Sequence, residues 1–182
     1  MKLAFLFGGE VMKKAGRCIV LIFMVLVLVA PWYSSVFAQD NKYTRETLRG
    51  LQGIEVLIES LKPEIRQRGL TEDQLRTDTE LKLRMAGIKV LSHKEKLSTP
   101  GNPYLYVNAN IISVAHTYVF NIVVEFRQDA FLIRVPNIRT FGGVPTWYVG
   151  EVGINPRLEE IRAVTKDLVD RFINAYLSVN PK

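Results

Sequence analysis

Few side chains in this sequence could transfer protons or bind a metal. Two histidines, His93 and His116, stand 23 positions apart, which matches no metal-ligand spacing. Glu55 and Glu59 lie two strand steps apart, with Glu125 on another strand that could share their face, and paired carboxylates can act as general acid and base. The plainer interpretation is a solvated sheet face and histidines in a loop and a turn. Neither an HExxH nor a GxSxG motif occurs, so we predict no catalytic residue, no metal site and no cofactor.

A cluster of arginine and aromatic residues is the best candidate for contact with a partner or ligand, because such side chains dominate binding energies at interfaces. The cluster lies in and beside the glycine-rich loop 137–153, and an outward tyrosine on a neighbouring strand would extend it. In the alternative interpretation, the tryptophan plugs the end of the sheet and the arginines are solvated. The candidate binding residues are Arg134, Arg139, Phe141, Trp147, Tyr148 and Tyr106.

These residues are held by the segment Tyr104–Val135, which is dense in β-branched and aromatic residues. Apolar and polar positions alternate from Leu105 to Ile111 and again from Tyr118 to Phe126, which predicts two strands of a hairpin. The phase then changes by one residue near 128–129. We interpret this as a β-bulge in one long, bent strand rather than a tight turn into a new strand.

Two helices have clear sequence signatures. Thr71 and Gln74 form a capping box that opens a helix over 71–86. A second helix, capped by Asn155 with Pro156 at its first position, carries one apolar stripe to about Leu177. Further strands are predicted at 53–61 (with a helix as the rival), 88–91 and 146–151. Residues 39–49 are predicted to be a frayed polar leader, and residues 92–103 a polar loop.

This order of elements predicts an α+β fold, a two-layer sandwich. We expect a mainly antiparallel sheet of four to five strands with two helices on one face. The other face would be open to solvent and would carry Asn108, Asn110, Asn121 and Glu125.

The N-terminus has the three parts of a secretory signal. Lys13, Lys14 and Arg17 precede an unbroken apolar run over 18–30, and Val36 and Ala38 supply small residues before Gln39. We therefore predict a signal peptide over 1–38, with Met12 as a plausible true start, and a single exported domain over 39–182. The alternative is an uncleaved membrane anchor, and both interpretations place the domain outside the cytoplasm.

Export changes how the composition is interpreted. The chain has one cysteine, Cys18, within the predicted signal, so the mature domain would lack disulfides, thiol catalysis and thiolate metal sites. Residues 1–38 carry a net charge of +3, which leaves +3 of the formal +6 for the domain. A mildly basic surface of mixed sign does not indicate a nucleic-acid partner.

Several sequence segments resemble those of known proteins. GLTEDQL followed by ELKLRMAGIKVL, the pair Thr146-Trp147 and the ending DRFINAYLSVNPK are similar to a group of small exported bacterial proteins of unknown function. The element order also resembles small α+β domains of the cell envelope. These are the N-terminal domain of the Tol-system propeller protein and the lipopolysaccharide-assembly lipoprotein. The resemblance implies a location but no activity.

We therefore expect a non-enzymatic exported envelope protein, periplasmic or secreted. It would bind a protein partner or a ligand through the open sheet face and the 137–153 loop. One alternative is a carrier of a small molecule or lipid, with a groove between the sheet and the last helix. Another is a small hydrolase that pairs His116 with Glu125 or Glu55. We expect the protein to contact a membrane only through its N-terminal segment, and only if that segment is not cleaved.

Overall fold

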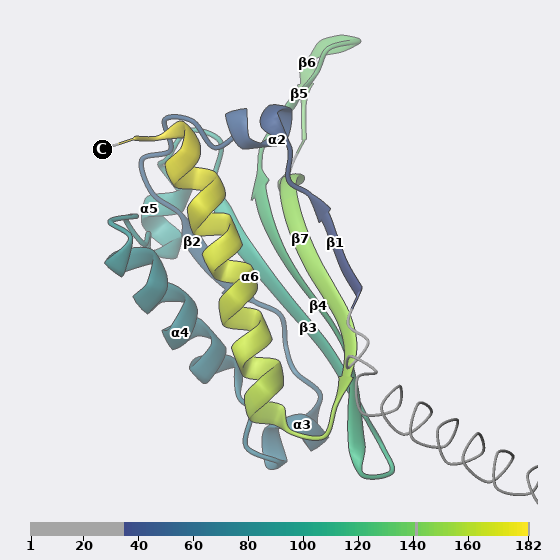
Figure 1. Ribbon diagram of the computed structural model, residues 1–182. Coiled ribbons are helices and arrows are strands. Elements are labelled where there is room, and N and C mark those ends of the chain that lie inside the picture. The colour runs from purple at the N-terminus through teal and green to yellow at the C-terminus, as the bar shows by residue number, and fades with distance from the viewer. Residues whose placement is uncertain (1–34, 141, 182) are drawn as a thin grey trace, which may run out of the picture. The chain divides into compact units, whose positions relative to one another are not determined.

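The computed structural model of the protein describes residues 35–140 and 142–181. A five-stranded sheet in the order β1-β7-β4-β3-β2 is covered on one face by helices α4 and α6 (Figure 1), and a separate pair of strands, β5 and β6, projects beyond it. The strands are β1 Ser35–Gln39, β2 Glu55–Ile58, β3 Tyr104–Val114, β4 Thr117–Gln128, β5 Phe131–Leu132, β6 Val135–Arg139 and β7 Val144–Asn155, and the helices are α2 Lys42–Glu46, α3 Pro63–Gln67, α4 Glu72–Met85, α5 His93–Leu97 and α6 Leu158–Val179.

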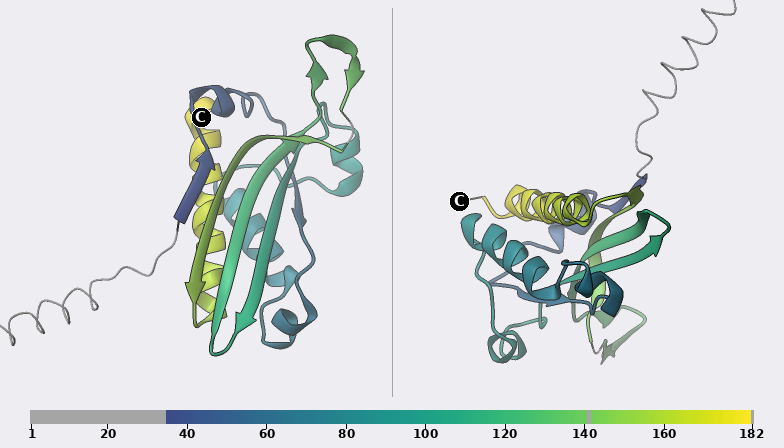
Figure 2. Two further views of the ribbon diagram at one scale, coloured as in Figure 1. Left: turned by 90° about the vertical axis from the view of Figure 1, so that its right-hand side faces the viewer. Right: turned by 90° about the horizontal axis from the view of Figure 1, so that it is seen from below.

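The predicted α+β fold is confirmed. The main sheet has five strands, and both predicted long helices lie on the same face of that sheet (Figure 2). Neighbouring strands are antiparallel except β2 and β3, which run parallel. The residues predicted to alternate do so: alternate side chains of β3 and β4 are buried under the helices, and Asn108, Asn110, Asn121 and Glu125 lie on the opposite, open face.

The core is centred where α6 crosses β4 and β7. The Phe172 ring of α6 stacks on Phe126 with centroids 5.9 Å apart, and it meets the Trp147 indole edge-on at 5.3 Å. All three side chains are fully buried. Aromatic pairs in these geometries add to the free energy gained from burial, so this trio fixes the angle of the helix on the sheet.

Helix α4 begins and ends as predicted. The Thr71 hydroxyl accepts a hydrogen bond from the Gln74 N–H at 3.3 Å, and the Gln74 side chain accepts one from the Thr71 N–H at 3.1 Å. The helix is joined to α6 by Lys82 with Asp170 and by Arg162 with Asp78, each pair 2.6 Å apart. These ion pairs flank the seam between the two helices.

The phase change after Phe126 has a different cause from the one predicted. Strand β4 ends at Gln128, and the chain turns into the new strand β5 instead of continuing through a bulge. A register shift does occur earlier, where Phe126 and Arg127 pair with Trp147 and Pro145 of β7, so the extra residue belongs to β7. Residues 131–135, which a continued strand would have placed on the main sheet, therefore lie outside it.

Two segments predicted to lack helix and strand contain both helices and part of a strand. Residues 39–49 contribute to β1 and α2 and bury Leu48 completely. Ser92 caps the short helix α5 in a capping box with Glu95, so the predicted loop 92–103 begins with a helix. Strand β7 is also longer than the predicted 146–151, because it pairs along β4 on one side and β1 on the other.

We predict that Phe172→Ala lowers the free energy of unfolding by about 3–5 kcal/mol, since it opens a cavity between the sheet and α6. Urea denaturation followed by circular dichroism measures the loss. Phe131→Ala is the matched control, because that ring is 66% exposed on the projecting strands, and its effect should stay within about 0.5 kcal/mol. Equal losses in the two variants would contradict this description of the core.

Candidate functional site

The most exposed apolar surface lies on the hairpin formed by β5 and β6, residues 131–139, which we call the arm. It leaves the end of the main sheet and projects from the domain (Figure 1). Every residue of the arm is exposed, and Ile133 at its turn is 97% exposed. The apolar side chains that it presents are Phe131, Leu132, Ile133, Val135 and Ile138.

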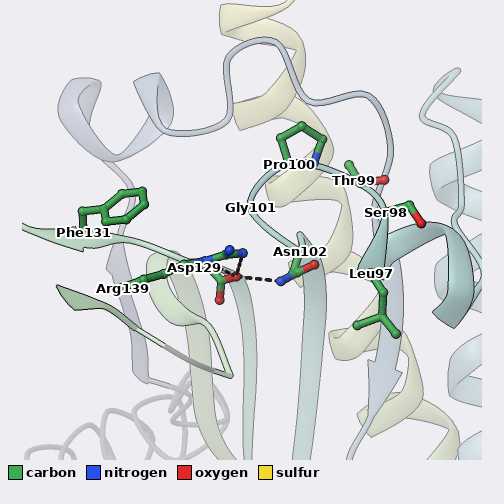
Figure 3. A pocket seen from close by; sticks show the side chains of 9 residues that line it. All are labelled: Leu97, Ser98, Thr99, Pro100, Gly101, Asn102, Asp129, Phe131 and Arg139. Atoms are coloured by element: carbon green, nitrogen blue, oxygen red, sulfur yellow. Dashed lines mark hydrogen bonds and ion pairs between the residues drawn. The ribbon is translucent and has the colours of Figure 1, made fainter. Parts of the chain in front are cut away.

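An ion pair fixes the base of the arm. The Arg139 guanidinium contacts the Asp129 carboxylate, with Nε to Oδ2 at 3.1 Å, and the Asn102 amide donates to the same oxygen at 2.6 Å (Figure 3). Gly101 and Asn102 both have positive φ angles of 83° and 46°, which aim the loop at Asp129. The Asp129 N–H also donates to the Gly101 carbonyl at 2.8 Å.

A pocket of about 500 Å3 opens between this loop and the arm, and we call it the arm pocket (Figure 3). Loop residues form one wall and the arm forms the other. Arg139 and Asn102 already donate hydrogen bonds to the Asp129 carboxylate. The pocket therefore offers a ligand mainly hydroxyl groups, backbone groups and apolar surface. Its lining residues are Leu97, Ser98, Thr99, Pro100, Gly101, Asn102, Asp129, Phe131 and Arg139.

The predicted binding residues are not gathered into one cluster. Arg134 lies exposed at the turn of the arm and Arg139 at its base. Tyr106 and Tyr148 lie on the open face of the sheet, on either side of Glu125 in one cross-strand row. Phe141 lies outside the described residues. The apolar side chains of the arm are not among the predicted binding residues, although the phase change after Phe126 lies just before them in the sequence.

Trp147 is part of the core and does not present a surface to a partner. Its ring is fully buried against Phe172, and its indole N–H donates to Asp40 at 2.9 Å. Arg45 donates two hydrogen bonds to the same carboxylate at 2.6 and 2.8 Å. The Arg45 guanidinium, and more weakly the indole N–H, hold the pKa of Asp40 below its usual value of 3.8. The structure therefore agrees with the alternative interpretation for Trp147, in which the side chain fills the core at the end of the sheet.

Tyr106 belongs to a self-contained polar network on the open face. Arg127 lies 4.8 Å from the centre of the Tyr106 ring and donates to Glu125 at 2.6 Å. The Tyr106 hydroxyl donates to Glu59. Burial, and then the hydrogen bond to Glu59, raise the pKa of Tyr106 to about 12. The polar groups in this half of the open face therefore form hydrogen bonds and ion pairs with one another.

The residues proposed for a hydrolase are not brought together. His116 lies in the turn between β3 and β4, whereas Glu125 pairs with Tyr106 near the other end of the same strands. Glu55 instead contacts His93 at 3.0 Å and Lys96 at 2.7 Å. In residues 35–140 and 142–181, no group of three or more histidine, cysteine, aspartate or glutamate residues could hold a metal ion.

The groove that a carrier would need between the sheet and α6 is occupied by core side chains, among them Leu168 and Phe172. The arm pocket lies elsewhere, at the end of the sheet. Within the part of the chain that the structure describes, no helix is both long enough and apolar enough to span a membrane.

Comparison with known proteins gives little further information. No protein-family model matches the chain, and no curated protein matches it. Among solved structures, the PelC dodecamer from Paraburkholderia phytofirmans is 9% identical, with a TM-score of 0.44 over 79% of this chain and 97% of that one. A single-substitution variant of the same PelC gives 9% identity and a TM-score of 0.43, over 79% and 98% of the two chains. At this distance the likeness says nothing about what the present chain binds or how it assembles.

We predict that Arg139→Ala loosens the base of the arm. The Asp129 side chain is only 6% exposed, so removal of its cation leaves a nearly buried carboxylate with fewer partners. Amide exchange at Thr140, whose N–H donates to the Ala130 carbonyl at 2.9 Å, should then accelerate about tenfold. Arg134→Ala, at the exposed turn of the same hairpin, should leave that exchange rate unchanged, and acceleration by both variants would rule out a specific role for the ion pair.

The Asp40 contacts predict a pH-dependent contribution to stability. Because the pKa of Asp40 is lowered on folding, its contribution is present above the usual value of 3.8 and is lost as the pH falls through the folded-state pKa. Asp40→Asn should therefore cost about 1 kcal/mol at neutral pH, and the difference from the natural chain should shrink progressively as the pH falls below 3.8. Urea unfolding over a pH series measures it. Glu46→Gln, in an exposed pair with Arg49, should give a smaller pH-dependent difference.

Proposed function

We propose that this protein is a non-enzymatic, exported component of the cell envelope that binds a protein partner through the arm. The N-terminal order of cationic residues, apolar run and small residues supports export to the periplasm or beyond. An uncleaved anchor would place the same domain on the same side of the membrane. Either way, the arm would meet other exported proteins.

The exposed apolar side chains of the arm are the observation that carries this proposal. Phe131, Ile133 and Ile138 are 66%, 97% and 50% exposed, so they contribute little to the core. A two-stranded hairpin is itself marginally stable in water, and aliphatic residues at its turn do not help to hold it. Contiguous exposed apolar surface is a common mark of an interaction site.

The charges of the arm indicate which partner surface would fit. Residues 130–140 include Arg134 and Arg139 and no acidic residue. Arg134 is exposed at the turn beside Ile133, whereas Arg139 is engaged at the base. An apolar depression with an acidic rim would complement an aliphatic tip that carries one exposed arginine.

The remaining apolar surface of the open face gives the partner a second area to contact. Its exposed side chains are Ile112, Val114, Val152 and Ile154, at the end of the sheet opposite the tyrosine network. Register places these residues on one face. We therefore propose two contact surfaces, the arm and this apolar patch, and the patch lies on the open sheet face that the sequence predicted as a contact surface.

Site-specific photocrosslinking in living cells tests the proposal. A photoreactive residue at position 133 should form a discrete adduct with another protein, while one at position 81, where Leu81 is 54% exposed on α4, should not. Ile133→Ser should weaken that complex by roughly tenfold or more, the loss expected for a buried aliphatic anchor. Leu81→Ser is the matched control. Adducts of equal strength at both positions, or none from the arm, would contradict a binding role for it.

A further inference from the structure

The outer edge of β7 is occupied by a short strand from the N-terminal side of the domain. Residues Ser35–Gln39 of β1 pair antiparallel with residues Val152 to Tyr148 of β7, with Phe37 opposite Gly150. Among the residues that the structure describes, β7 is the sole neighbour of β1 in the sheet, and Val36 and Phe37 are 45% and 38% exposed. The strand therefore covers an edge that pairs readily with any extended chain.

The contact is shaped around an aromatic side chain. A Cβ atom at Gly150 would lie 2.3 and 2.6 Å from two carbons of the Phe37 ring, so the ring rests directly on the glycine backbone. Tyr148 lies beside it, with the ring centres 6.4 Å apart. The edge of β7 thus combines a row of backbone hydrogen-bonding groups with one aromatic slot, the pattern by which sheets recognise extended peptides.

The same residues form the predicted cleavage site. Val36 and Ala38, the small residues that a signal peptidase would recognise, pair with Glu151 and Val149 of β7. Cleavage after Ala38 would remove four of the five residues of β1. Asp40 would stay in place, because it is held by Arg45 and Trp147. Processing would therefore uncover the aromatic slot and leave the rest of the domain intact.

We propose that the edge of β7 is a strand-acceptor site that the precursor fills with its own cleavage-site residues and that processing opens. Its occupant is an extended segment of another exported polypeptide, with an aromatic residue over Gly150 flanked by β-branched and small residues, as Phe37 is flanked by Val36 and Ala38. This inference rests on the export proposed above. It is independent of the arm, which lies beyond the end of the sheet (Figure 1).

The experiment begins with the full-length gene and the exported protein. Intact mass of the protein recovered from the envelope gives its N-terminus, and cell fractionation gives its location. The processed protein is then titrated with a synthetic peptide of residues 34–39, and amide shifts are followed by NMR. We expect shifts at Tyr148, Gly150 and Val152, and none at Leu81 on α4.

Two peptide series supply the controls without changing the protein. Replacing the peptide's phenylalanine with alanine should weaken binding about tenfold, the equivalent of losing one well-packed aromatic contact. N-methylation of alternate residues tests backbone pairing, since alternate N–H groups of an edge strand point toward the sheet and away from it. One alternating set should abolish binding and the other should retain it.

The outcomes are distinct. Processed protein that binds the phenylalanine peptide, with one inactive methylated set, supports the strand-acceptor site. Exported protein that keeps residues 35–38 overturns it while leaving export intact, and protein found in the cytoplasm overturns export itself. Processed protein that does not bind the peptide, or that binds both methylated sets equally, also overturns it. A concentration-dependent dimer that the peptide dissociates would assign the edge to a second copy of this chain instead.

Discussion

The burial of Trp147 under α6 is the contact on which the rest of the domain depends. The indole joins three parts of the chain: β7, which carries it; α6, whose Phe172 packs against it; and Asp40, which accepts its N–H. Because an indole N–H needs a partner when it is buried, Asp40 must lie at the end of the sheet. That requirement orders residues 39–49, which the sequence pattern alone indicated to be frayed.

A second constraint separates the structural aromatic residues from the exposed ones. Strand β4 must end at Gln128, and the chain must leave the sheet so that β7 can return along it. Residues 131–139, which lie between the two strands, form the arm, and Asp129, Arg139 and Asn102 hold its base. Apolar side chains on a hairpin outside the main sheet lie away from the core, so another molecule would have to supply their further burial.

The two candidate interaction surfaces have different physical characters. The arm offers side chains on a narrow support, and a partner would recognise its shape and its arginine. The edge of β7 offers backbone groups and one aromatic slot over Gly150, and it would recognise extended polypeptide. A protein with both features could hold a partner at one surface and pair with a strand at the other, without a catalytic group at either.

Local patterns determined much of the fold. Alternation in β3 and β4, the capping box at Thr71 and the apolar stripe of α6 each depend on neighbours within a few residues, and each was predictable. Contacts between distant residues determine the parallel pairing of β2, the position of β1 and the point where the arm leaves the sheet. Local sequence patterns do not indicate such contacts. For the same reason, a tryptophan beside arginines indicated a contact surface, whereas the tertiary structure decided that its partners are Phe172 and Asp40. Residue type sets which interactions are possible, and the path of the chain selects which of them are formed.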